Sequence, residues 1–182
     1  SKAGYWGSVE VTGANRLTAV YPAISEQNGN AILLENFYLN HMVYASDDAV
    51  CVDGKNSDDW AGVTDAHFIG SAAQAQATVR YAMANGVLYI LVERRDDSLT
   101  AGDRTAVYLA DTAGKAYRLV VDAAGEVTME SGIGAAFAAV DGKFTAASTV
   151  LTEGIVTEIA VDLTSIGLEN RGGLKVNYAL RN

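Results

Sequence analysis

The chain of 182 residues is poor in cysteine and proline, with one of each, Cys51 and Pro22. One cysteine forms no internal disulfide bond, so it does not fix the compartment, and its apolar neighbours favour a small buried side chain. Turns must come from the 18 glycines instead of proline. No apolar run approaches the ~20 residues that span a bilayer, so we expect no membrane insertion.

Two further absences concern the N-terminus and the charges. Residues 1–6 lack the apolar core of a signal peptide, and the first residue is Ser1 instead of methionine, which suggests a fragment or a processed form. Charged residues make up only 19 %, and the formal net charge is −9. An acidic chain without a basic stripe repels phosphate backbones, which argues against nucleic acid and anionic polysaccharides. Neutral glycans or a cation such as calcium fit better.

Hydrophobic residues make up 49 % of the chain, and their pattern indicates strands. No window of twelve residues carries a helical apolar stripe, whereas short apolar runs recur between glycine, asparagine and aspartate. The expected strands are 8–11, 17–21, 31–39, 41–45, 50–52, 76–84, 87–94, 105–110, 116–122, 126–130, 137–140, 144–150, 155–161 and 174–180. This pattern predicts an all-β fold, an antiparallel β-sandwich of the jelly-roll or immunoglobulin-like two-sheet kind.

Two turns carry strong hairpin signals. Asn85-Gly86 is the preferred dipeptide of a type I′ turn and lies between two alternating runs. Asp141-Gly142-Lys143 lies between the next pair of short apolar runs. We expect residues 1–182 to form a single sandwich domain, in which residues 1–41 supply further strands or form an appendage.

A succession of short motifs resembles the family 9 carbohydrate-binding modules over about residues 42–182. These motifs are Val52-Asp53-Gly54 followed by Trp60, the hairpin Gly86-Val87-Leu88-Tyr89, Asp103 before the strand at 106–111, Arg118 within 116–119, and Glu158 within 154–163. The resemblance implies a β-sandwich carried by a secreted or cell-surface bacterial protein, as an accessory module beside a glycoside hydrolase. The family position of Trp60 also implies that it belongs to the core, where its ring can plug one end of the sandwich.

The resemblance places a sugar contact at Arg118, because sugar-binding members carry an arginine in this strand. Tyr117 and Tyr81 are the aromatic residues that we expect beside it as a platform for a neutral glycan. The members' tryptophan clamp has no counterpart here: residues 99–102 contain no aromatic residue, and Ala106 replaces the strand's glutamate. The expected binding is therefore weak.

The family also implies a structural calcium ion, for which we expect Asp96, Asp97 and Asp103 as ligands on one acidic loop. Calcium takes six to eight oxygen ligands, which such a loop can supply. The alternative is a solvated acidic turn.

Three functions remain open. The first is a non-catalytic module that binds a neutral glycan. The second is a structural spacer or protein-interaction domain that docks a neighbouring domain of the same chain through an exposed apolar patch or a free strand edge. The third, an enzyme, is the least favoured, because the two histidines, His41 and His67, lie 26 residues apart and no nucleophile motif is present.

Overall fold

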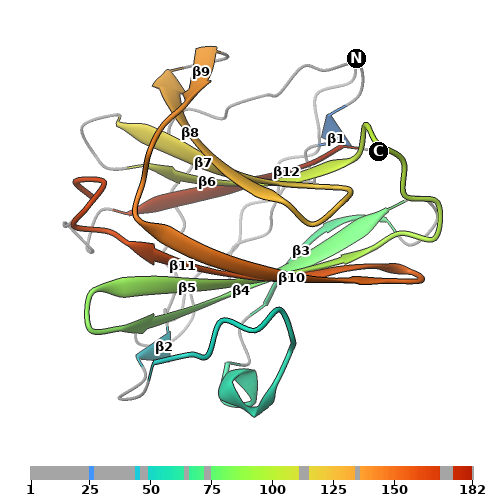
Figure 1. Cartoon of the computed structure of the whole chain (residues 1–182), viewed down its shortest axis with the longest axis horizontal. Helices are drawn as coiled ribbons and strands as arrows, with labels where there is room; N and C mark the ends of the chain where they lie inside the picture. The colour runs from blue at the N-terminus through green and yellow to red at the C-terminus, as the bar shows by residue number, and fades with distance from the viewer. Residues whose placement is uncertain are drawn as a thin grey trace, which may run out of the picture.

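The structure is a computed structural model of the chain, and it describes residues 25–26, 44–45, 49–63, 66–71, 75–110, 115–133, 136–168 and 174–181. Two layers of strands lie face to face (Figure 1). The elements are β1 (Ser25–Glu26), β2 (Tyr44–Ala45), the 3-10 helix η1 (Asp58–Trp60), β3 (Ala66–Gly70), β4 (Gln76–Ala84), β5 (Val87–Arg95), β6 (Arg104–Ala110), β7 (Ala116–Asp122), β8 (Val127–Ile133), β9 (Ala136–Ala139), β10 (Phe144–Leu151), β11 (Gly154–Asp162) and β12 (Lys175–Arg181). None of the helices in these described ranges could cross a membrane.

The strands of the described residues form two sheets of six. Sheet A has the order β1-β12-β6-β7-β8-β9, and sheet B has the order β10-β11-β5-β4-β2, with β3 also paired to β4. Neighbours are antiparallel except for two short parallel pairs, β1 with β12 and β2 with β4. The predicted fold class, an antiparallel β-sandwich, is confirmed.

The core lies between the sheets because the strands alternate in the expected way. On β4, Ala77, Val79 and Tyr81 point inward, and on the paired strand β5 the inward residues include Leu88 and Ile90. Four of these five are completely buried, and Tyr81 retains 4 % of its exposure. Burying a large aliphatic side chain contributes about 2 kcal/mol, so one alternating strand pair supplies a large part of the stabilising free energy.

The Asn85-Gly86 turn has the geometry that its sequence predicts. Asn85 has a φ of 51° and Gly86 a φ of 85°, as a type I′ turn requires at both central positions. The strands on either side, β4 and β5, pair antiparallel along their full length. This hairpin is confirmed.

The second predicted hairpin, at Asp141-Gly142-Lys143, is wrong. β9 pairs with β8 in sheet A, whereas β10 pairs with β11 in sheet B, so the segment crosses from one sheet to the other. The glycine serves close packing here: a Cβ atom on Gly142 would lie 2.1 Å from the sulfur of Met129. An Asp-Gly pair therefore indicates that the chain turns, but it does not indicate with which strand the following segment pairs.

A few other segments differ from expectation. The strand expected at 50–52 is a loop, and β3, which the sequence did not suggest, lies at 66–70. The strands expected at 8–11, 17–21 and 31–39 lie outside the described residues. Within the N-terminal part, Ser25–Glu26 pairs with Leu180–Arg181 and so adds a short strand to sheet A.

Candidate functional site

The outer face of sheet A carries a polar row that includes Arg118. Residues of β7 alternate, so Leu119 points into the core and Arg118 points outward. Register places Arg118 between Tyr108 of β6 and Glu130 of β8, with Asn177 of β12 beside Tyr108. The row on one side of it contains only small residues on three strands, Ala110, Ala116 and Gly132. The same row ends at Phe137 of β9, which register places opposite Gly132.

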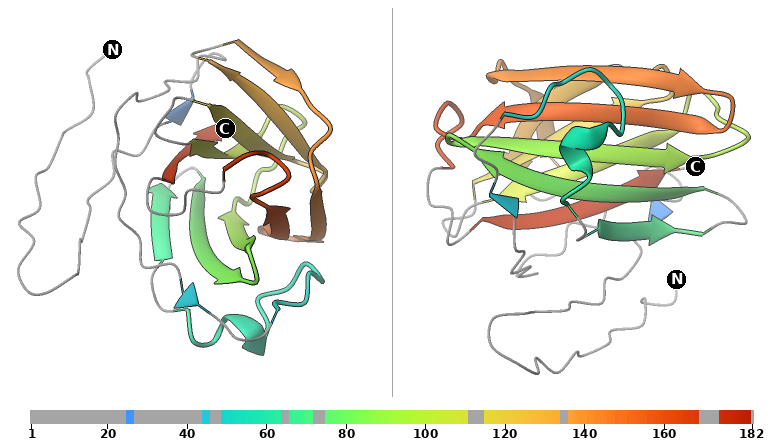
Figure 2. Two further views of the ribbon diagram at one scale, coloured as in Figure 1. Left: turned by 90° about the vertical axis from the view of Figure 1, so that its left-hand side faces the viewer. Right: turned by 90° about the horizontal axis from the view of Figure 1, so that it is seen from below.

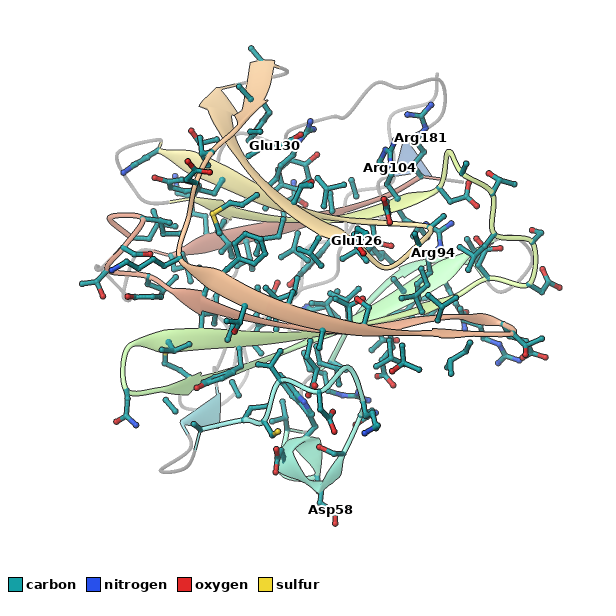
Figure 3. All side chains as sticks on the ribbon, in the orientation of Figure 1. Asp58, Arg94, Arg104, Glu126, Glu130 and Arg181 are labelled. Carbon is teal, nitrogen blue, oxygen red and sulfur yellow. The ribbon has the colours of Figure 1, made fainter. Side chains whose placement is uncertain are left out.

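Arg118 is held in place by two kinds of contact. Its Nε donates a hydrogen bond to the Glu130 carboxylate, and its guanidinium lies over the ring of Phe137, 4.7 Å from the centroid. Phe137 in turn meets the ring of Tyr108 edge to face, at 5.9 Å and 80°. About a quarter of each charged side chain is exposed, 24 % for Arg118 and 23 % for Glu130. Figure 3 shows Glu130 on the outer side of sheet A.

The electrostatics of this cluster keep Arg118 charged. Burial acts to lower the pKa of Arg118, but the hydrogen bonds that its guanidinium donates to Glu130 and Tyr108 outweigh burial, and the pKa is raised. A guanidinium fixed on an aromatic ring and a carboxylate offers a rigid set of donors and acceptors. Sugar hydroxyls are the kind of ligand group that such a set can bind.

The two tyrosines predicted beside Arg118 do not share its face, and this part of the prediction is corrected. Tyr117 points between the sheets, 7 % exposed, and its hydroxyl donates to the carbonyl oxygen of Ile166 at 2.8 Å. Tyr81 belongs to sheet B and packs in the core, with its ring 6.2 Å from that of Tyr178. Neighbouring strand residues point to opposite faces, so Tyr117 and Arg118 cannot form one platform.

The residues that do surround Arg118 were missed by sequence reasoning. Glu130 lies on the next strand, and Phe137 lies in the alanine-rich strand β9. One signal in the sequence could have identified Glu130. If residues 116–122 and 126–130 pair as a hairpin around the turn at 123–125, Arg118 lies opposite Glu130. No comparable signal identifies Phe137, because the sequence does not fix the register of the alanine-rich strand β9 against β8.

The acidic loop predicted to hold calcium surrounds an arginine. Arg94 lies between the two sheets and is 6 % exposed (Figure 3). Its Nη2 donates to Asp96 Oδ2 at 2.6 Å and lies 3.6 Å from Asp103 Oδ2, while its Nη1 donates to the carbonyl oxygen of Arg181 at 3.0 Å. One guanidinium thus joins β5, the loop after it and the end of β12.

The remaining oxygens of this loop bind its own turns. Asp96 Oδ1 accepts from the backbone N–H of Ser98 at 2.9 Å, and Asp103 Oδ1 accepts from the hydroxyl of Thr100 at 2.9 Å. Burial acts to raise the pKa of Asp96, but the bonds from Arg94 and Ser98 outweigh it, and the pKa is lowered. Asp97 is exposed.

These contacts bear on the calcium prediction. A cation between Asp96 and Asp103 would meet the positive charge of Arg94, so the arrangement does not fit an ion at that point. Within the described part of the chain, no group of three or more histidine, cysteine, aspartate or glutamate side chains is placed to hold a metal. Calcium binding by Asp96, Asp97 and Asp103 stays a prediction.

A second buried charge, Glu158 of β11, anchors the loop at residues 49–63 to the outer face of sheet B. Glu158 is completely buried. Its Oε2 accepts from the backbone N–H groups of Asp53 and Gly54, both at 2.7 Å, and its Oε1 accepts from Trp60 Nε1 at 2.6 Å. The Asp53-Gly54 turn and Trp60 are therefore both held by the carboxylate of Glu158. We call this arrangement the Glu158 anchor.

The Glu158 anchor places Trp60 differently from the prediction. Trp60 is buried, as expected, with 3 % exposure, but it packs on Tyr89, Leu91 and their neighbours on the outer face of sheet B, and does not plug one end of the sandwich. The right-hand view of Figure 2 shows the loop and η1 lying across that sheet. Cys51 in the same loop is exposed, so its expected burial is wrong.

The comparisons with known proteins support the fold. No protein-family model and no curated protein sequence matches this chain. The structure is similar to a family 9 carbohydrate-binding module from Caldicellulosiruptor kristjanssonii in complex with cellotriose, with a TM-score of 0.54 and 16 % identity over 75 % of this chain and 74 % of that chain. A family 9 module from the same organism in complex with glucose is similar at a TM-score of 0.48 and 19 % identity, over 65 % and 67 %. The resemblance to this family is thus found in the fold as well as in the sequence motifs.

Proposed function

We propose that this protein is a non-catalytic carbohydrate-binding module that binds a neutral glycan weakly through the outer face of sheet A. The observation that carries the proposal is the cluster of Phe137, Arg118 and Glu130, in which an aromatic ring lies beside a fixed, partly exposed pair of charged groups. The fold shared with a module that was solved in complex with cellotriose supports the same class of ligand.

The chemistry of the cluster suits a sugar. The apolar ring of Phe137 can contact the C–H groups of a pyranose, while the guanidinium and the carboxylate can donate to and accept from adjacent hydroxyls. A single ring contributes less than a two-sided clamp, which makes the expected affinity low. The net charge of −9 favours an uncharged glycan over an acidic one.

The biological setting extends the same proposal. The family resemblance supports an accessory module of a secreted or cell-surface bacterial protein that acts on polysaccharide, beside a glycoside hydrolase. Structural calcium at Asp96, Asp97 and Asp103 stays a prediction of the same resemblance, although the Arg94 guanidinium beside Asp96 and Asp103 does not favour a cation there.

A glycan-array screen of the isolated protein tests the proposal, run with calcium and again with EDTA. We expect binding to a neutral glycan, its loss in Arg118→Ala, and its retention in Arg95→Ala. Arg95 is the matched control because it also pairs with a glutamate, Glu153, at 3.5 Å but lies on sheet B and is 71 % exposed. Equal glycan binding by Arg118→Ala and the unmodified protein would contradict the site. Loss of binding in EDTA would support the calcium prediction.

A second candidate function is a structural or docking module without a small ligand. It is favoured by two exposed apolar side chains on the edge strand β10, Val150 and Leu151, with 54 % and 52 % exposure. This function expects a folded protein that binds no glycan on the array in either condition.

A further inference from the structure

Two arginines lie side by side at one end of the outer face of sheet A. Arg104 of β6 and Arg181 of β12 are directly opposite each other in the antiparallel register. Leu180, which precedes Arg181, packs in the core between the sheets, so the two arginines lie on the outer face. Figure 3 shows both of them on the same side of sheet A as Glu130. Both side chains are half-buried.

The pair differs from the other arginines in the described part of the chain. Each of those has a carboxylate partner: Arg80 with Glu93, Arg94 with Asp96, Arg95 with Glu153 and Arg118 with Glu130. The guanidinium groups of Arg104 and Arg181 form no ion pair and no hydrogen bond with the described residues. With 22 acidic side chains against 13 basic ones, the protein has enough carboxylates to pair every arginine, so this exception is not a shortage of acids.

The acidic residue next to Arg104 binds the backbone instead. Asp122 of β7 lies opposite Arg104 in the register. Its Oδ1 accepts from two backbone N–H groups of the following turn, at 2.9 and 3.0 Å, and its carboxylate forms no ion pair with Arg104. On the other side of the pair, the register sets Glu26 of β1 opposite Arg181. The carboxylate of Asp122 therefore stabilises the turn and leaves the arginine pair with its charge.

Such a pair is costly unless an anion joins it. Like charges directly opposite each other on neighbouring strands destabilise a sheet. Partial burial adds to this cost, because a guanidinium that leaves water without a hydrogen bond loses solvation. The Cα atoms of directly opposite residues are about 5 Å apart, so one small anion can reach both guanidinium groups. A carboxylate, with two oxygens for the planar donor forks of arginine, matches this arrangement.

The arginine pair shares its face with the proposed glycan site. Arg104 lies four residues before Tyr108, which register places beside Arg118, and four residues of a strand span about 13 Å. The row between them consists of the apolar residues Ala179, Ala106 and Val120. An oligosaccharide of a few sugars can cover this distance, so a ligand bound at Arg118 can extend to the arginine pair.

We propose that Arg104 and Arg181 bind a single carboxylate group, and that the proposed glycan carries this group as a uronic acid on an otherwise neutral chain. The binding of a carboxylate follows from the arginine pair alone, whereas its attachment to a glycan rests on the proposed function. A glycan with an acid on every sugar is still repelled by the net charge of −9. The pair therefore selects glycans in which uronic acid groups are isolated.

Nuclear magnetic resonance of the isotope-labelled full chain tests the carboxylate site, with the side-chain Nε–H signals of arginine as the readout. Glucuronic acid is expected to shift the signals of Arg104 and Arg181, and glucose at the same concentration is not. Arg104→Gln and Arg181→Gln should each weaken the binding about tenfold. Arg95→Gln is the matched control on sheet B and should leave the binding unchanged.

Three results of this titration would overturn the proposal. The first is that glucuronic acid shifts neither signal. The second is that chloride at the same ionic strength gives equal shifts, which would show only screening. The third is that shifts appear only in Asp122→Asn or Glu26→Gln, which would show that neighbouring acids already neutralise the pair.

Two oligosaccharides separate this inference from the proposed function: cellotriose, and the same chain carrying one glucuronic acid side group. In calorimetric titration the acidic ligand should bind at least tenfold more tightly, and the double variant Arg104→Gln with Arg181→Gln should lose this gain. Equal affinity for the two ligands would overturn the glycan as the source of the carboxylate. Binding of free glucuronic acid without any binding of cellotriose would support the arginine site and contradict the proposed function instead.

Discussion

The outer faces of the two sheets use a glutamate in opposite ways. On sheet B, Glu158 is completely buried, and its carboxylate is bound by two backbone N–H groups at 2.7 Å and by the indole of Trp60 at 2.6 Å. On sheet A, Glu130 is 23 % exposed and pairs with Arg118, which is equally exposed. One face is closed by its own loop, and the other presents a charged pair to solvent.

The difference separates residues that stabilise the fold from residues that can bind. Two of the motifs that resemble the carbohydrate-binding family are the Asp53-Gly54 turn and Trp60. Their donors are bound to Glu158 in the anchor, so they are not available to a ligand. The proposed glycan binding would therefore rely on less conspicuous residues, of which Arg118 and Phe137 are the best placed. Changes at the anchor should cost stability, and changes on sheet A should cost affinity.

The largest expected effect is at the anchor itself. Glu158→Ala leaves buried backbone donors and an indole N–H without their acceptor, and should lower the free energy of unfolding by about 4 kcal/mol. Denaturant unfolding measures the change. Glu126→Ala, at an exposed glutamate, should change it by less than about 0.5 kcal/mol. A Glu158→Ala protein as stable as the control would contradict the anchor.

A smaller loss is expected at the acidic loop, and it depends on pH. Asp96→Asn removes the ionised partner of the buried Arg94 and should cost about 3 kcal/mol near neutral pH. Because the pKa of Asp96 is lowered in the folded protein, its contribution is present above the ordinary carboxyl pKa and is lost as pH falls through the folded value.

Unfolding measured from neutral to acid pH checks this sign. The stability difference between wild type and Asp96→Asn should be largest at neutral pH and should shrink below about pH 4. A constant difference across the range would show that the ionisation of Asp96 contributes nothing.

Trp60→Phe tests the contribution of the indole hydrogen bond to the Glu158 anchor. It keeps most of the ring burial but removes the Nε1–H donor to Glu158, and should destabilise by about 2 kcal/mol. Thermal and denaturant unfolding measure the loss. Glycan affinity of the folded variant should equal that of the wild type, and reduced affinity would move part of the site to sheet B.

The smallest expected effect on stability is at Arg118. Its ion pair with Glu130 is partly solvated, so Arg118→Ala should change the free energy of unfolding by no more than about 1 kcal/mol. Glycan affinity should fall tenfold or more, since the guanidinium supplies the fixed donors. Calorimetric titration together with an unfolding curve measures both quantities, and a large loss of stability with unchanged affinity would reverse the proposed roles.

Local patterns were enough to predict much of the fold. β4 and β7 have the predicted bounds, because strict alternation and turn residues such as Asn85-Gly86 act over a few neighbouring residues. The connection at Asp141-Gly142-Lys143 could not be assigned, since turn chemistry is the same whether the chain returns to its own sheet or crosses to the other. β3 was missed because its alternation is short and interrupted by His67.

The candidate site was harder to predict, for a geometric reason. Arg118 was found through resemblance, whereas Tyr117 and Tyr81 were chosen by chemical type, which does not state the face of a strand. The period of two rules out adjacent residues such as Tyr117 and Arg118 as one platform. Arg94 was missed for a related reason. A charged residue in a strand is expected to face solvent, and its burial becomes evident only when its partners Asp96 and Asp103 are placed around it.

The most direct test of the central claim is a calorimetric titration of cellotriose into three proteins: wild type, Phe137→Ala and Phe68→Ala. Phe137 stacks on Arg118 at the outer face of sheet A, whereas Phe68 is an exposed aromatic residue on sheet B. The account predicts weak binding by wild type and by Phe68→Ala, and at least a tenfold loss in Phe137→Ala with its fold retained. Equal affinity of wild type and Phe137→Ala for this glycan would contradict it.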